Sequence, residues 1–173
     1  MKEIIFQQLK RAIDKFYENE GRNLKLNVHE ITHCHRLAYY FENFIREYDE
    51  ENGTHYFLNY SVDLEFNRDA KGDPKRVMRD GKCENTRCDI LLHSKGLCKP
   101  ENLLVMELKK GNNEYLVDND IKELRRMVSP VELESEDACI CGTLLGVFLR
   151  ICRNGCSGTK YWYENGEIKE ENF

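Results

Sequence analysis

The sequence predicts a single α/β domain in which helices flank a mixed central sheet. Apolar residues recur at helical spacing through the first 48 positions, and an alternation of period two begins at His55. Beyond it, short apolar runs typical of buried strands stand on both sides of one further helical segment. The coarse order of elements is therefore α, α, β, β, β, α, β, β, with an αβββαβ core. A chain of 173 residues can bury a substantial core within one domain.

Two amphipathic helices are expected before the first strand. One covers residues 2–19 and stops at Gly21, and the other covers residues 27–48. Asn27 is the expected N-cap of the second helix, with Glu30 three residues later in a capping-box arrangement. The apolar stripes are Ile4, Ile5, Leu9, Ile13 and Phe16 in the first helix, and Leu37, Tyr40, Phe41, Phe44 and Ile45 in the second.

The remaining elements follow from the period of the apolar residues and from turn signals. A long alternating strand is expected over residues 55–67, and the polar segment 68–84 after it is expected to be a loop. Asn165-Gly166 is typical of a two-residue turn and predicts a terminal hairpin. The other expected elements are strands at 88–93, 103–109 and 138–151, a helix at 117–127, and hairpin strands at 160–163 and 167–169.

The whole chain, residues 1–173, is expected to form one domain with three parts. These are an N-terminal helix in 1–26, the core in 27–151 and the C-terminal hairpin in 152–173. No stretch reaches the roughly eighteen apolar residues that a membrane-spanning helix needs. The first residues carry an early acid, Glu3, and lack the apolar block of a signal peptide. The expected location is the cytoplasm, with no membrane partner.

Composition and net charge exclude some classes of protein. Hydrophobic residues make up 40% of the chain and charged residues 33%, which is ordinary for a soluble globular protein. The net charge of −5 argues against a non-specific nucleic-acid binder, which would normally be basic overall. It leaves room for an enzyme that acts on nucleic acid, because carboxylates that hold a metal ion add negative charge.

Eight cysteines are the unusual feature of the composition. A disulfide framework is typical of short secreted chains, and this chain shows no export signal. No pair has the C-x₂-C spacing of a zinc ribbon, so most are expected to be reduced thiols, with zinc binding left open. They are Cys34, Cys83, Cys88, Cys98, Cys139, Cys141, Cys152 and Cys156.

One group of residues predicts chemistry. Glu107 and Lys109 are two positions apart on an apolar strand, so their side chains leave the same face. Burying a carboxylate and an ammonium there is unfavourable unless they pair or hold an ion. Asp89 opens the preceding strand, and adjacent strands lie about 4.8 Å apart. The spacing therefore allows Asp89 and Glu107 to hold one hard cation, such as Mg²⁺. A neighbouring lysine can orient or help deprotonate the attacking water and stabilise the pentacovalent phosphate.

The segments that carry these residues resemble the PD-(D/E)XK nuclease superfamily, which has the restriction-endonuclease-like fold. The resemblance covers roughly residues 27–150, and further pieces resemble a bacterial branch of that group. Cys88 stands where the superfamily name has proline, a position that often varies. The matching segments are residues 87–93 (RCDILLH) and 102–110 (NLLVMELKK), with 30–40 (EITHCHRLAYY), 62–68 (VDLEFNR) and 120–124 (DIKEL) as the further pieces.

The resemblance implies a Mg²⁺-dependent endonuclease, with Mn²⁺ as a substitute metal. It implies metal ligands at Asp89 and Glu107, a catalytic Lys109 and a contribution from Glu30. The backbone carbonyl of Leu108 is the candidate third protein ligand. Candidate nucleic-acid contacts are Lys110, Lys122 and Arg36.

Other interpretations of these residues stay open. Glu107 and Lys109 can form an exposed pair on an edge strand, where a salt bridge is worth about 0–1 kcal/mol. Asp89 can be a turn acid, and Glu30 can be only the capping-box acid of its helix. A cluster of His29, His33 and His35 is interpreted as a surface or phosphate-facing patch rather than a zinc site.

Other functions stay open as well. The same fold can serve as an inactive nucleic-acid-binding or structural module, or as an RNA nuclease. The expected partner is nucleic acid, DNA before RNA, with a homodimer as an open alternative.

Overall fold

The computed structural model describes residues 1–26, 28–68, 72–74, 76–79, 82–111, 117–130 and 142–173. In that part of the chain, four helices and a six-stranded mixed sheet form a mixed α/β structure. The helices are α1 (Lys2–Asn19), α2 (Gly21–Leu26), α3 (Glu30–Asn52) and α4 (Val117–Val128). The sheet strands are β1 (Ser61–Leu64), β4 (Ile90–His93), β5 (Asn102–Lys110), β6 (Leu145–Cys152), β7 (Gly155–Glu164) and β8 (Glu167–Asn172).

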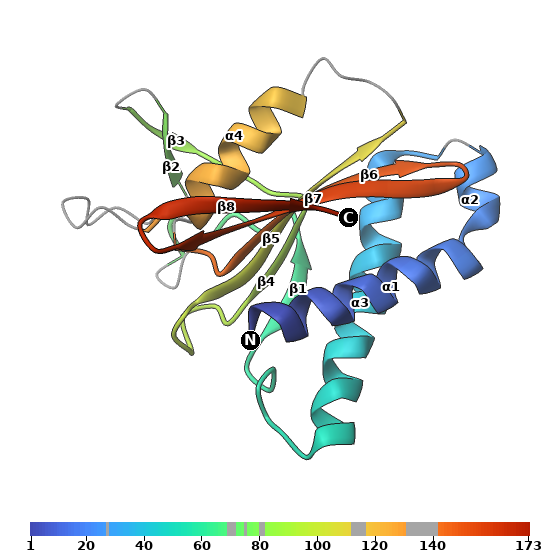
Figure 1. Ribbon diagram of the computed structural model, residues 1–173, viewed down its shortest axis with the longest axis horizontal. Coiled ribbons are helices and arrows are strands. Elements are labelled where there is room, and N and C mark those ends of the chain that lie inside the picture. The colour runs from blue at the N-terminus through green and yellow to red at the C-terminus, as the bar shows by residue number, and fades with distance from the viewer. Residues whose placement is uncertain (27, 69–71, 75, 80–81, 112–116, 131–141) are drawn as a thin grey trace.

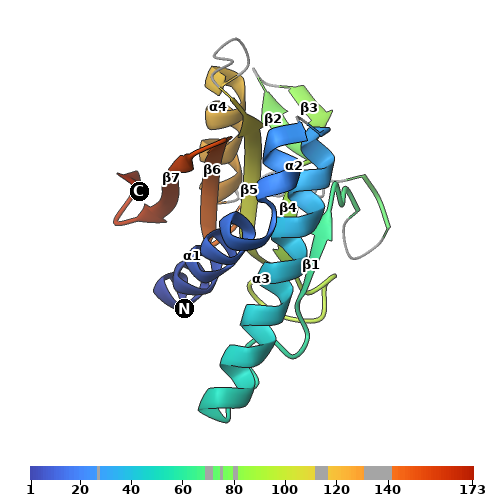
Figure 2. The ribbon, with the colours of Figure 1, turned by 90° about the vertical axis from the view of Figure 1, so that its right-hand side faces the viewer.

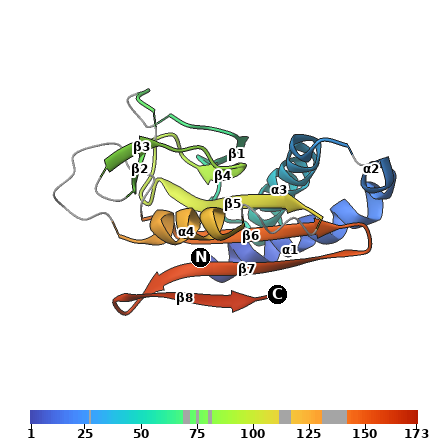
Figure 3. The same ribbon diagram turned by 90° about the horizontal axis from the view of Figure 1, so that it is seen from above.

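The sheet lies between two layers of helix (Figures 1 and 2). Its strands run in the order β1-β4-β5-β6-β7-β8, which Figure 3 shows from above. The β5–β6 pair is parallel and the other pairs are antiparallel. One core cluster joins α1 and α3 to one face of the sheet, and a second cluster joins α4 to the other.

Strand β5 separates these two clusters residue by residue. Leu104, Met106 and Leu108 belong to the cluster under α1 and α3, whereas Val105 belongs to the cluster under α4. Since side chains alternate along a strand, Glu107 and Lys109 leave the α4 face with Val105. The expected shared face of Glu107 and Lys109 is therefore the one that α4 covers.

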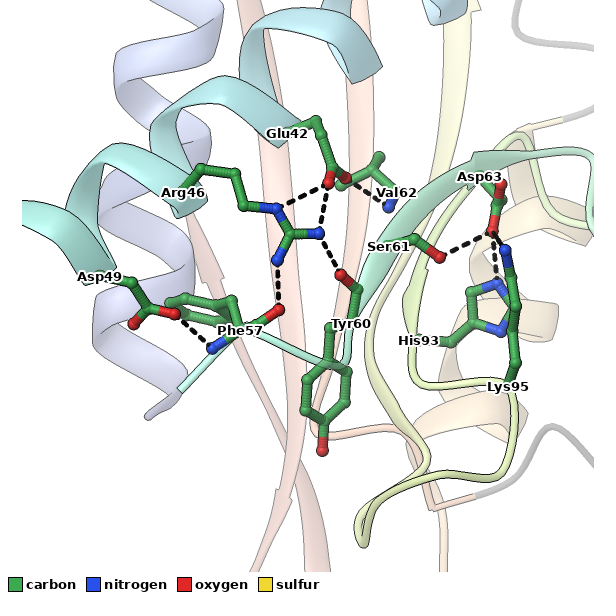
Figure 4. A network of polar contacts seen from close by, with 10 residues as sticks. All are labelled: Glu42, Arg46, Asp49, Phe57, Tyr60, Ser61, Val62, Asp63, His93 and Lys95. Carbon is green, nitrogen blue, oxygen red and sulfur yellow. Dashed lines mark hydrogen bonds and ion pairs between the residues drawn. The ribbon is translucent and has the colours of Figure 1, made fainter. Parts of the chain in front are cut away.

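The expected long strand over residues 55–67 is wrong, because β1 contains only Ser61–Leu64. The residues before it form turns that α3 fixes (Figure 4). The Asp49 carboxylate accepts hydrogen bonds from the backbone N–H groups of Tyr56 and Phe57 at 3.0 and 2.8 Å. Arg46 donates to the backbone carbonyls of Phe57 and Tyr60. These side-chain bonds occupy backbone groups that a sheet ladder would otherwise use.

The expected loop over 68–84 is also wrong in part. It contains β2 (Arg76–Arg79), which pairs antiparallel with β3 (Lys82–Asn85). The signal for this hairpin was Asp80-Gly81, a dipeptide typical of two-residue turns, between two short strands. Strand β2 lies against α4 (Figure 1).

The start of the second long helix differs from the sequence prediction. Helix α3 begins at Glu30, and its N-cap is His29, whose ring Nδ1 accepts a 3.4 Å hydrogen bond from Ile31 N–H. Asn27, the predicted N-cap, lies outside the described residues. Glu30 is therefore the first helical residue and not the third, so the capping-box interpretation is wrong.

Several other elements agree with the sequence. Helix α1 has the predicted bounds, α4 ends one residue later than expected, and β4 and β5 coincide with the two apolar runs. The hairpin of β7 and β8 turns at Asn165 and Gly166, both with positive φ, although each strand is longer than predicted. Strand β6 starts at Leu145, so residues 142–144 are not part of the strand as predicted, and the predicted residues 138–141 lie outside the described residues.

Two expectations about the chain as a whole can be compared with the structure. Among the side chains that the structure describes, five cysteines have free thiols: Cys34, Cys88, Cys98, Cys152 and Cys156. In the portion of the chain described here, no helix is both long and apolar enough to cross a bilayer.

Candidate active site

Asp89 and Glu107 bring their carboxyl groups together across the β4–β5 pair. Ile90 lies opposite Met106, so one further step along the same antiparallel register places Asp89 opposite Glu107. Asp89 Oδ2 accepts a 2.8 Å hydrogen bond from the backbone N–H of Leu108, which fixes the aspartate against β5. The two carboxyl groups lie near enough that each affects the pKa of the other. The sequence spacing predicted this juxtaposition.

The environment of this carboxyl pair disfavours two negative charges. Glu107 is only 7% exposed, and burial, followed by the nearby Asp89 and Asp120 carboxylates, raises its pKa well above the ordinary value. Burial also raises the pKa of Asp89, although the hydrogen bond from Leu108 and the attraction of Lys109 oppose it. These effects favour a shared proton or a cation between the two carboxyl groups.

Lys109 places its ammonium group beside the pair, between two further carboxylates. Its Nζ lies 3.2 Å from Asp120 Oδ2 on α4 and 3.6 Å from Glu30 Oε1 on α3. Burial lowers the pKa of Lys109, but Asp120, Asp89 and Glu30 outweigh that effect and raise it. Lys109 is therefore held as an ammonium ion, which suits stabilisation of negative charge better than removal of a proton from water.

Glu30 contacts the end of β5 through both carboxylate oxygens. Oε2 accepts a 3.0 Å hydrogen bond from the backbone N–H of Lys110, and Oε1 faces the Lys109 ammonium. The glutamate thus turns toward the sheet rather than toward its own helix start. The structure brings Glu30, Asp89, Glu107 and Lys109 into one group.

The other residues predicted for this site have different surroundings. Lys110 Nζ donates a 2.7 Å hydrogen bond to the carbonyl of Val28. Arg36 Nε forms a 2.6 Å ion pair with Glu20. Lys122 is exposed on α4. Of the three candidate nucleic-acid contacts, Lys122 presents the most accessible charge, whereas Lys110 and Arg36 already hold parts of this chain together.

The histidines do not form the expected patch. His29 and His35 are exposed, but His33 is fully buried and packs its ring edge-on against Phe16, with 5.6 Å between ring centroids. Neither ring nitrogen of His33 has a hydrogen-bond partner among the described residues. Burial, and then the positive charge of Lys110, lower the pKa of His33. The interpretation of this residue as part of a surface patch is wrong.

A second polar group lies on β1 and β4 (Figure 4). Asp63 Oδ2 is 2.9 Å from His93 Nε2 and 2.8 Å from Lys95 Nζ, and it accepts a 3.0 Å hydrogen bond from Ser61. Burial would raise the pKa of Asp63, but the hydrogen bonds from Lys95, His93 and Ser61 outweigh burial and lower it. These compensated charges join β1 to β4 and have no need of a further ion.

Asp120 is a member of the site group that the sequence analysis left without a role. Its Oδ2 is shielded from solvent and faces Lys109. Burial raises the pKa of Asp120, while Lys109 acts in the opposite direction. In the sequence, Asp120 is one of two acids in the first turn of a helix, where an acid ordinarily reflects the helix dipole, and this hid its contact with β5.

The site fits a hard cation held by few protein ligands. Within the described ranges, no three His, Cys, Asp or Glu side chains are grouped so as to hold one ion. Asp89 and Glu107 offer two carboxylates, and the candidate backbone ligand, the Leu108 carbonyl oxygen, accepts a 3.4 Å hydrogen bond from Lys109 Nζ. Mg²⁺ is commonly bound by one or two carboxylates and keeps several waters, so this donor set suits it.

Comparison with known proteins adds no assignment. No protein-family model matches the chain, and no curated protein has a significantly similar sequence.

Proposed function

We propose that this chain is a Mg²⁺-dependent nuclease that hydrolyses phosphodiester bonds of DNA. The observation that carries the proposal is that the half-buried Asp89 and the buried Glu107 lie opposite each other across the β4–β5 pair, with the Lys109 ammonium nearby. Repulsion between the buried Glu107 carboxylate and the half-buried Asp89 carboxylate is unfavourable for folding, and a divalent cation bound between them would relieve it. Mn²⁺ is expected to replace Mg²⁺ because it accepts the same oxygen donors.

We further propose that the core is restriction-endonuclease-like. The succession α3, β1, β4, β5, α4, β6 supports this, since it repeats the αβββαβ order expected from the sequence. A second support is the placement of the acids, one before β4, one within β5 and one at the start of α3. Strands β7 and β8 extend the sheet beyond β6 and lie outside that core.

Each residue of the site has a chemical task in this proposal. Asp89 and Glu107 would hold the metal, which when bound supplies positive charge to the phosphate and its attacking water. The Lys109 ammonium stabilises the negative charge that builds up on the phosphate oxygens as the water attacks. Glu30 fixes the end of β5 through Lys110 N–H and orients Lys109, so it supports the reacting groups without being required as a metal ligand.

The choice between nuclease and inactive module depends on the lysine. A module that only binds nucleic acid needs positive surface charge, and it gains nothing from an ammonium ion enclosed by carboxylates. Lys109 is only 22% exposed and forms ion pairs with Glu30 and Asp120. Such a lysine is poorly placed for generic phosphate binding and well placed to act on one phosphate at the carboxyl pair.

A cleavage assay with several substrates tests the proposal. Purified protein is incubated with circular duplex DNA, linear duplex DNA, single-stranded DNA and single-stranded RNA, each with Mg²⁺, Mn²⁺, Ca²⁺ or EDTA. We expect cleavage of DNA with Mg²⁺ and Mn²⁺ and none with EDTA. Cleavage of RNA alone would show that the substrate is RNA and not DNA. Cleavage that persists in EDTA would exclude the metal-dependent mechanism.

Matched variants show whether the cleavage comes from this site or from a contaminating nuclease. Asp89→Asn, Glu107→Gln and Lys109→Met are each expected to reduce cleavage by about 100-fold or more, as expected for groups that stabilise transition-state charge. Glu51→Gln, an exposed acid on α3, serves as the control and should keep wild-type cleavage. Equal cleavage by all four variants would assign the activity to another protein.

A further inference from the structure

The Lys109 ammonium is held from two helices that cover opposite faces of the sheet. Asp120 on α4 lies 3.2 Å from Nζ, and Glu30 on α3 lies 3.6 Å from it. The backbone carbonyl of Leu108 lies 3.4 Å away. Asp120 is the nearer of the two carboxylates, and its Oδ2 is shielded from solvent.

This arrangement matters because Lys109 also attracts the carboxyl pair. Lys109 favours the charged forms of Asp89 and Glu107, which lie opposite each other across the β4–β5 pair. When a divalent cation is added to the metal-free protein, it competes with the ammonium for the same two carboxylates. A lysine side chain has four rotatable carbon bonds and can reach toward either set of acids. Its position therefore decides whether the pair is open to a metal.

We propose that Asp120 is a positioning residue that holds Lys109 beside the Asp89–Glu107 pair and prevents the ammonium from occupying the metal position. This inference rests on the proposed function. Asp120 acts through the lysine, so its effect on metal binding exists only while Lys109 is present. Glu30 alone, at the longer distance and with its other oxygen bound to Lys110 N–H, does not hold the ammonium as firmly.

A double-mutant cycle with Mn²⁺ as the probe tests this inference without substrate. Mn²⁺ affinity is measured by calorimetric titration for the wild type, Asp120→Asn, Lys109→Met and the double variant. We expect Asp120→Asn to weaken Mn²⁺ binding about tenfold, the order of effect seen for residues that orient ligands. In the Lys109→Met background the same substitution should change the affinity by less than about twofold.

Two controls keep the test decisive if Asp120→Asn also affects folding. Asp118→Asn lies in the same first turn of α4 and is exposed, so it removes an equal helix-end charge and should leave Mn²⁺ binding unchanged. Asp120→Glu keeps the carboxylate and should restore part of the Mn²⁺ affinity. Since a purely structural role would weaken both backgrounds alike, the coupling with Lys109 is the readout that such a role does not produce.

The outcomes distinguish this inference from the proposed function. Failure of the wild type to bind Mn²⁺ would overturn the proposed function itself. Wild-type binding with no effect of Asp120→Asn would overturn only the positioning role. An equal loss in both backgrounds would also overturn it, because Asp120 would then act on the cation directly.

Discussion

Glu30 and Lys110 are joined by a 3.0 Å hydrogen bond between the glutamate Oε2 and the lysine backbone N–H, although they are 80 positions apart in the chain. The bond ties the first residue of α3 to the last residue of β5. It also aims the other oxygen, Oε1, at the Lys109 ammonium. One side chain therefore links the helix layer, the strand end and the candidate catalytic lysine.

Glu30→Gln is expected to separate turnover from stability. The glutamine can still accept the bond from Lys110 N–H, but it loses its ion pair with Lys109. Metal-dependent cleavage should fall tenfold or more, as for supporting residues of metal sites. The free energy of unfolding should change by less than about 1 kcal/mol, since the ion pair is partly exposed. Wild-type cleavage by this variant, relative to Glu51→Gln, would remove Glu30 from the mechanism.

Glu107→Gln is expected to stabilise the metal-free protein while weakening metal binding. Glutamine has the same shape, removes a buried charge and can donate a hydrogen bond to Asp89. Because the pKa of Glu107 is raised in the folded state, the folded protein retains a proton that the unfolded chain releases, and wild-type stability falls as pH rises above about 4.5. The stabilisation should therefore be small at pH 5 and reach about 1 kcal/mol near pH 8, where chemical unfolding measures it. A destabilised Glu107→Gln at pH 8 would contradict the electrostatic description.

His33 is expected to make the protein sensitive to mild acid. Its pKa is lowered in the folded state, so the unfolded chain binds a proton first as pH falls. The contribution of neutral His33 to the free energy of unfolding is complete above about pH 6.5. It is lost below that pH, by up to about 1.4 kcal/mol per pH unit. His33→Leu removes this titrating group, so the fall in unfolding free energy between pH 7 and 5.5 should be smaller. The substitution breaks no hydrogen bond among the described residues, because neither ring nitrogen has a partner there. His35→Gln, at an exposed position, is the control, and an unchanged slope in His33→Leu would rule out this source of acid sensitivity.

Much of the fold is predictable because its signals are local. The period of apolar residues locates α1 and α4, and Asn165-Gly166 locates the β7–β8 turn. The short length of β1 is not local information. It depends on Asp49 and Arg46 of α3, which bind the backbone ahead of the strand. An alternating sequence cannot reveal that its backbone groups are hydrogen-bonded to side chains of a distant helix.

The residues of the candidate site also divide into those that local sequence predicts and those that depend on tertiary packing. Asp89, Glu107 and Lys109 are predictable because one strand and its neighbour set their spacing. Asp120 reaches the site only through the packing of α4 on the sheet, which no sequence spacing encodes. The burial of His33 likewise follows from contact with Phe16 on another helix.

Asp49→Ala is expected to loosen the turns before β1. The Asp49 carboxylate accepts three hydrogen bonds, from Thr54 Oγ1 at 2.7 Å and from the N–H groups of Tyr56 and Phe57. Removing this acceptor leaves the buried N–H of Phe57 and two partly buried donors unpaired, and should lower the free energy of unfolding by about 2 kcal/mol. Glu50→Ala, exposed on the same helix, is the matched control. Equal stability of the two variants in urea would show that the turns hold without Asp49.

The most direct test of the central claim is a calorimetric titration of the protein with Mn²⁺ in the absence of nucleic acid, comparing the wild type with Asp89→Asn and Glu107→Gln. If the carboxyl pair is the metal site, the wild type binds Mn²⁺ and each variant loses at least about tenfold in affinity, because each retains one carboxylate of two. Exposed-site variants such as Glu51→Gln should match the wild type. Equal Mn²⁺ affinity in the wild type and both site variants, or no binding by the wild type, would contradict the account.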